Sequence, residues 1–70
     1  MNNKENAARL AVRIRTASIL ATLRAILSEL STLPETDRRK ELIASNRSMI
    51  EVIEKMLASI DADISENSDE

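Results

Sequence analysis

The chain has 70 residues and contains no aromatic side chain, histidine, cysteine or glycine. A chain this short forms at most one domain, and without aromatics it lacks the large side chains that anchor most cores. Without cysteine it has neither a disulfide framework nor a cysteine zinc site, so oligomerisation is the remaining way to complete a core. The net charge is −2, which points to no strongly charged partner.

The charges are unevenly distributed along the chain. Residues 1–33 carry five basic and two acidic side chains, whereas residues 34–70 carry five basic and ten acidic ones. The two halves should therefore attract each other, which suits a hairpin.

The first expected helix covers about residues 5–32, after a frayed segment at 1–4. Its large apolar residues are spaced by 4, 3, 4 and 3, which predicts a heptad seam on one face; they are Ile19, Leu23, Ile26, Leu30 and Leu33. Leu20 and Leu27 widen this seam. A lighter stripe follows the other side of the same helix, at Leu10, Ile14, Ala17 and Ala21.

Pro34 ends this helix, because proline disfavours helical geometry in the residue before it. The second helix is expected over about 35–64, either with Pro34 in its first turn or with Thr36 as its cap. A connection of a few residues joins antiparallel neighbours. Residues 1–70 thus form a single helical-hairpin domain, with an acidic tail expected to be disordered over about 65–70.

The second helix has a wide apolar face. One row is spaced by 4, 3, 4, 3 and 4, and it contains Leu42, Asn46, Met49, Ile53, Met56 and Ile60. A flanking row repeats every seven residues, at Ile43, Ile50, Leu57 and Ile64. Three apolar positions in seven are typical of a bundle helix, and a two-stranded seam would be narrower.

We therefore predict an all-α fold, in which an antiparallel helical hairpin dimerises into a four-helix bundle. Its oligomer core is expected to contain Ile19, Leu23, Ile26, Leu30, Leu42, Asn46, Met49, Ile53, Met56 and Ile60. Charge supports the antiparallel arrangement. Asp61 and Asp63 lie in the last turns of the second helix, where the helix dipole disfavours them, and a hairpin brings them near Arg9.

Two features of the core row have alternative interpretations. Asn46 can fix register and oligomeric state at a cost in stability, or it can lie at the edge of the apolar stripe. Met49 and Met56 can form an adaptable binding groove, but methionines at such positions more often fill a core.

The sequence gives no sign of catalysis. It has no histidine or cysteine, no serine with a suitable base, and no metal-binding or phosphate-binding motif. We expect no enzyme activity, no metal and no cofactor. The longest uncharged stretch, 16–23, is far shorter than the about 20 residues that span a membrane. We expect a cytoplasmic protein without membrane contact.

Three surfaces are candidates for binding a partner. The lighter stripe, flanked by Arg13 and Arg24, is the first choice, because small residues permit close helix approach. That stripe is equally suited to the interior of a homodimer or of a larger homo-oligomer. A second candidate is the basic patch of Arg38, Arg39 and Lys40. The third is a row along one side of the first helix that suits nucleic-acid phosphates; it consists of Arg9, Arg13 and Arg24, with Asn2 and Asn6.

In size, hairpin plan and seam the chain resembles the Rop-like proteins of plasmid copy-number control, which are dimeric hairpins that bind RNA. The resemblance is architectural, and the chain has no aromatic residue for base stacking.

The leading hypothesis is a non-enzymatic regulatory or inhibitory protein that acts by docking on another protein, in the manner of phage or plasmid antirepressors. The first alternative is a Rop-like dimer that binds RNA or DNA. The second is a structural oligomerisation subunit.

Overall fold

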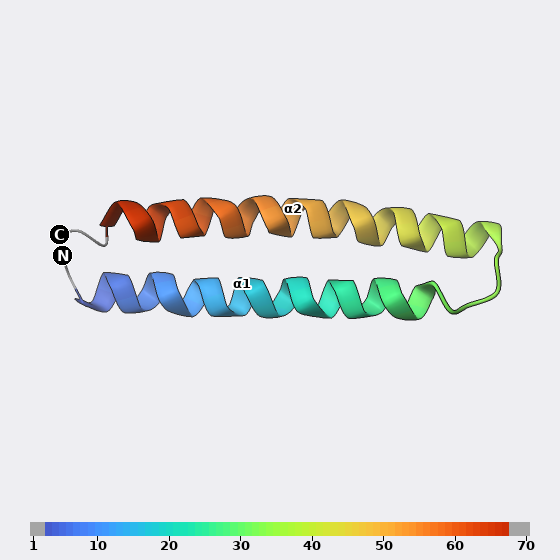
Figure 1. Ribbon diagram of the computed structural model, residues 1–70, viewed down its shortest axis with the longest axis horizontal. Helices are drawn as coiled ribbons and strands as arrows, with labels where there is room; N and C mark the ends of the chain where they lie inside the picture. The colour runs from blue at the N-terminus through green and yellow to red at the C-terminus, as the bar shows by residue number, and fades with distance from the viewer. Residues whose placement is uncertain (1–2, 68–70) are drawn as a thin grey trace.

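The computed structural model describes residues 3–67, which form an antiparallel hairpin of two helices, α1 (Asn3–Leu30) and α2 (Asp37–Asn67) (Figure 1). The hairpin is a rod of 52 × 14 × 12 Å. Its radius of gyration is 16.1 Å, compared with about 11 Å for a compact domain of this length. The predicted all-α hairpin is confirmed, and its shape leaves both helices open along their length.

The end of α1 tightens before the chain turns. The N–H of Thr32 donates to the carbonyl of Glu29 at 3.0 Å, and the N–H of Leu33 donates to that of Leu30 at 3.2 Å. These bonds reach back three residues, which is the tighter pattern common at helix ends. Pro34 then prevents the helix from continuing.

Thr36 caps α2. Its hydroxyl oxygen accepts the backbone N–H of Arg39 at 3.1 Å, and its carbonyl accepts the N–H of Lys40 at 3.1 Å. This is the usual N-cap arrangement, in which a threonine satisfies a free N–H of the first turn. Of the two starts that the sequence allowed, the one capped by Thr36 is therefore found.

The helix ends differ from those expected. Residues 3–4 were expected to fray and residues 65–67 to be disordered, but they belong to α1 and α2 respectively. Near these ends the two helices are in contact, since Arg9 pairs with Asp63 at 2.9 Å and Ile64 is half-buried. The other residues of the expected frayed start and disordered tail, 1–2 and 68–70, lie outside the described residues.

The two helices meet along a narrow row. Because α1 and α2 are the only elements of the described segment, a side chain that loses exposure does so chiefly against the other helix. Residues of this row on α1 are Thr16, Leu20, Leu23, Leu27 and Leu30, and on α2 they are Ile43, Asn46, Ile50, Ile53, Leu57, Ile60 and Ile64. Leu20 is the one buried apolar side chain among the described residues, at 5% exposure.

This row follows one edge of the expected seam. On α1 the contact centres on Leu20 and Leu27, which widen the predicted seam, while Ile19 and Ile26 are exposed. A three-in-seven face is wider than the contact between two helices. The hairpin therefore buries one edge of each face and leaves the other edge open.

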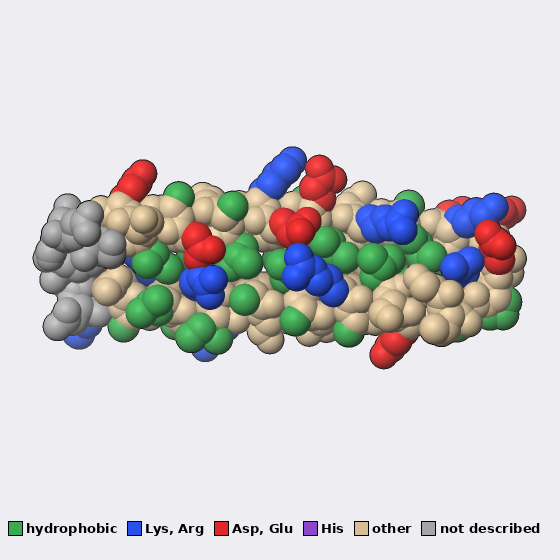
Figure 2. Space-filling view, viewed as in Figure 1, with side chains coloured by type: hydrophobic (Ala, Val, Ile, Leu, Met, Phe, Trp, Pro, Cys, Tyr) green, Lys and Arg blue, Asp and Glu red, His purple; other side chains and the backbone are tan. Residues whose placement is uncertain are grey.

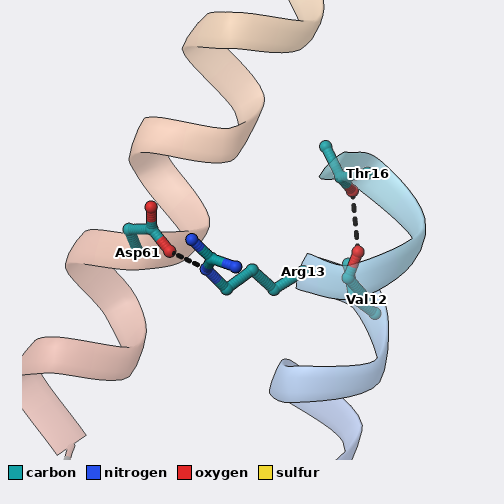
Figure 3. Close-up of polar contacts among 4 residues, drawn as sticks. All are labelled: Val12, Arg13, Thr16 and Asp61. Carbon is teal, nitrogen blue, oxygen red and sulfur yellow. Dashed lines mark hydrogen bonds and ion pairs between the residues drawn. The ribbon is translucent and has the colours of Figure 1, made fainter. Parts of the chain in front are cut away.

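Two polar side chains are buried in the row. The Thr16 hydroxyl donates to the carbonyl of Val12 at 2.8 Å, so its burial costs little (Figure 3). Asn46 is 3% exposed, and its Oδ1 has no hydrogen-bond partner. An unpaired buried amide oxygen opposes folding by about 1–3 kcal/mol, so Asn46 weakens the contact between the two helices.

Candidate functional site

One long side of the hairpin carries exposed aliphatic side chains at heptad spacing. We call it the heptad face, and it consists of Val12, Ile19 and Ile26 on α1 and Leu42, Met49 and Met56 on α2. Their exposed fractions lie between 37% and 50%. Ile19 and Ile26 come directly before the contact residues Leu20 and Leu27, which places them about 100° round the helix from the contact.

Two grooves show that the heptad face is continuous across both helices. The larger groove has a volume of about 400 Å³ and is lined by Ile19, Leu23, Ser45, Ser48, Met49, Val52 and Ile53. The smaller has a volume of about 290 Å³ and is lined by Ala8, Arg9, Val12, Ile60 and Asp63. Each groove takes residues from α1 and α2, so an occupant of this side would contact both helices.

The lighter stripe lies on the other flank of α1. We call it the alanine face, and it consists of Leu10, Ile14, Ala17 and Ala21. Leu10 is 45% exposed and Ile14 is 65% exposed. Ala21 follows Leu20 by one residue, which turns it away from the side that carries Ile19. The structure thus brings the predicted stripe together on a surface separate from the heptad face.

Ion pairs join α1 and α2 beside the alanine face. The Arg13 guanidinium donates to Asp61 (Figure 3), and Arg24 pairs with Glu54 at 3.1 Å. Figure 2 shows the side of the hairpin that carries the alanine face. Acidic groups meet basic groups there over the junction between the helices. Exposed pairs of this kind stabilise by less than about 1 kcal/mol each. Their main effect is to fix the antiparallel register, and they occupy both arginines that flank the stripe.

A third pair links the open end of the hairpin. Arg9 lies 2.9 Å from Asp63, and both residues line the smaller groove. The expectation that Asp63 would approach Arg9 is confirmed. Asp61 instead pairs with Arg13, one turn further along α1.

The predicted basic patch is divided by the structure. Arg38 pairs with Glu41 at 3.4 Å on the surface of α2, and Lys40 is exposed. Arg39 turns toward α1, where its guanidinium donates to the carbonyls of Leu30 at 3.1 Å and Ser31 at 3.3 Å. A cation on the free carbonyls of a helix end is favourable, so Arg39 caps α1 and holds the two helices together.

This role of Arg39 was missed in the sequence. Its signal was present, because a hairpin with a short turn places the first turn of the second helix beside the last carbonyls of the first. The expected oligomer core is also divided. Its members Leu23, Leu30, Ile53 and Ile60 are half-buried in the hairpin contact, Asn46 is buried there, and the remaining five are exposed on the heptad face.

Among residues 3–67, no three acidic side chains gather closely enough to hold a metal ion. Within the same range, neither helix has a stretch long and apolar enough to cross a membrane. Comparisons with models of protein families, with curated proteins and with solved structures find no match to this chain. The resemblance to Rop-like proteins therefore stays one of size and plan.

Proposed function

We propose that the chain is a non-enzymatic regulatory or inhibitory protein that works as a homodimeric four-helix bundle and docks on another protein. The observation that carries this proposal is the pair of apolar faces on one hairpin. A single apolar side chain, Leu20, is buried among the described residues, while ten large hydrophobic ones are exposed. Such a chain needs partners on both sides.

Accessible area supports a second copy on the heptad face. The hairpin exposes 5244 Å², whereas a compact monomer of 7.8 kDa exposes roughly 4,400 Å². The excess is close to the about 800 Å² that each partner buries in a standard stable interface. Two hairpins that cover each other's heptad faces form the four-helix bundle.

The alanine face stays outside this bundle and is the proposed docking site for the target. Ala17 and Ala21 allow a helix to approach closely, and Leu10 and Ile14 provide the apolar contact. The neighbouring side of α2 carries Glu54 and Asp61, which already hold arginines of α1. We therefore propose that the target presents one amphipathic helix, which needs no more than this single stripe.

The Rop-like alternative is less favoured. Arg9, Arg13 and Arg24 each already pair with an acid of α2, so a nucleic-acid phosphate would have to compete with these carboxylates. The third hypothesis, a structural subunit, requires no target beyond the homo-oligomer itself.

The test is a capture experiment from the native host with the full chain and with matched variants. Ile14→Asp should lose the captured protein while its helical content and mass stay unchanged, because Ile14 is 65% exposed. Ala44→Asp, at an exposed position of α2 that belongs to neither face, is the control and should retain the captured protein. Capture abolished by nuclease and by moderate salt would support the Rop-like alternative instead. Loss of fold in Ile14→Asp would place the alanine face in the core.

A further inference from the structure

Two opposite charges lie beside the apolar stripe of α1. Arg15 and Glu29 follow Val12 and Ile26 by three residues, so they lie on the same side of the helix as the heptad face. They stand seven residues before and seven residues after Thr22. Neither side chain forms an ion pair or a hydrogen bond with the described residues.

Two further opposite charges extend the stripe of α2. Arg38 stands four residues before Leu42, and Asp63 stands seven residues after Met56. Their midpoint falls between residues 50 and 51. Both have partners within the chain, but their side chains remain 76% and 54% exposed, so each can meet another charge.

The two midpoints lie at the same level of the rod. The larger groove shows this directly, because its α1 lining, Ile19 and Leu23, brackets Thr22, while its α2 lining includes Met49 and Val52. A single axis perpendicular to the rod can therefore pass both midpoints. In a two-fold interface each residue meets its counterpart reciprocally. Such an axis places Arg15 opposite Glu29 of the second copy, and Arg38 opposite Asp63 of the second copy.

The other symmetric arrangement has both loops at the same end. In that case α1 lies beside α2 of the second copy, at the register that the hairpin already has. Glu29 then comes within one helical turn of the level of Glu41 of the second copy, which is a pair of like charges. Arg15 and Glu29 no longer complement each other, so charge favours the arrangement with loops at opposite ends.

We propose that two copies pack through the heptad face with their loops at opposite ends, about a two-fold axis that runs between the copies, perpendicular to the rod, at the level of Thr22 on α1 and of Ile50 and Glu51 on α2. The inference rests on the proposed homodimer and adds its symmetry and its specificity-determining charges. The larger groove lies on this axis and is shared by both copies. Met49, which is 48% exposed beside it, is a flexible side chain suited to fill such a space.

A charge exchange tests the pairing. Arg15→Glu and Glu29→Arg should each raise the dimer dissociation constant about tenfold, because each places two like-charged contacts in the interface. The double variant restores opposite charges and should return to within about twofold of the original value. A double variant as weak as the single ones, or single variants without effect, would overturn the proposed pairing.

A distance measurement tests the direction of the loops. The chain has no cysteine, so Glu35→Cys in the turn accepts one spin label per copy. Opposite loops predict a separation of about 50 Å, the length of the rod. A separation below about 25 Å, a few interhelical spacings, would overturn the axis while leaving the dimer intact. A sample without any inter-label distance would refute the dimer itself. Neither result depends on docking by the alanine face.

Discussion

The heptad face and the alanine face differ in the kind of partner that they can bind. The heptad face spans both helices, repeats every seven residues and carries large aliphatic side chains along most of the rod. The alanine face is confined to α1, and the adjoining side of α2 is occupied by acids that hold Arg13 and Arg24. A surface that needs a second helical pair is thus separated from one that fits a single helix. Under the proposed function, one short chain would use the first surface for self-association and the second for docking.

The largest expected effect comes from a charge in the middle of the heptad face. Ile19→Asp should abolish the dimer at micromolar concentration and lower helical content, because two uncompensated carboxylates would be buried in each bundle. We expect a loss of about 3 kcal/mol or more of association free energy. Sedimentation and circular dichroism measure both effects.

Ser18→Asp is the control, one residue away on the exposed side of α1. It should change the free energy of unfolding by less than about 0.5 kcal/mol. If Ile19→Asp remains a fully helical dimer, the second copy does not cover the heptad face.

A smaller effect, of opposite sign, is expected at Asn46. Replacing it by leucine removes the unpaired buried Oδ1 and should stabilise the fold by about 1–3 kcal/mol in urea denaturation. Arg47→Leu, at the exposed neighbouring position, should be nearly neutral. If Asn46 also fixes the oligomeric state, the variant will populate more than one oligomer. A stabilised variant that stays a single dimer would limit Asn46 to a local polar defect, and a destabilised one would show that its amide is satisfied in the assembly.

The smallest effect is expected at the turn, which belongs to neither face. Arg39→Ala removes the two bonds to the carbonyls of Leu30 and Ser31. It should cost about 1 kcal/mol of unfolding free energy without changing the dissociation constant of the dimer. Lys40→Ala is the matched control and should be neutral. A change in the dimer with Arg39→Ala would mean that the loop contacts the second copy.

The sequence was informative about the helices and less so about their rotation. Pro34, the heptad spacing and the division of charge predicted two helices, a short turn and an antiparallel pair. They did not predict that Leu20 and Leu27 would face α2 while Ile19 and Ile26 would stay open. Both rows are aliphatic, and a wide face offers two nearly equivalent rotations. The contact chosen depends on the packing of both helices together.

The candidate surfaces were predicted to a similar extent. The stripe of Leu10, Ile14, Ala17 and Ala21 was recognisable because helical periodicity alone places these residues on one side of α1. The division of the basic patch was not recognisable in the sequence. Arg39 binds carbonyls at the end of α1, and these lie near it only after the chain has folded into a hairpin. The spacing of residues along one helix can be determined from the sequence. Predicting which residues of two helices are in contact also requires the register between the helices.

The central claim is that the heptad face is covered by a second copy of the chain. Sedimentation equilibrium of the full chain at micromolar concentration tests it most directly. We expect a single helical species with twice the chain mass of 7.8 kDa, and we expect the mass to fall to that of one chain in Ile19→Asp. A stable, fully helical species of 7.8 kDa under the same conditions would contradict it.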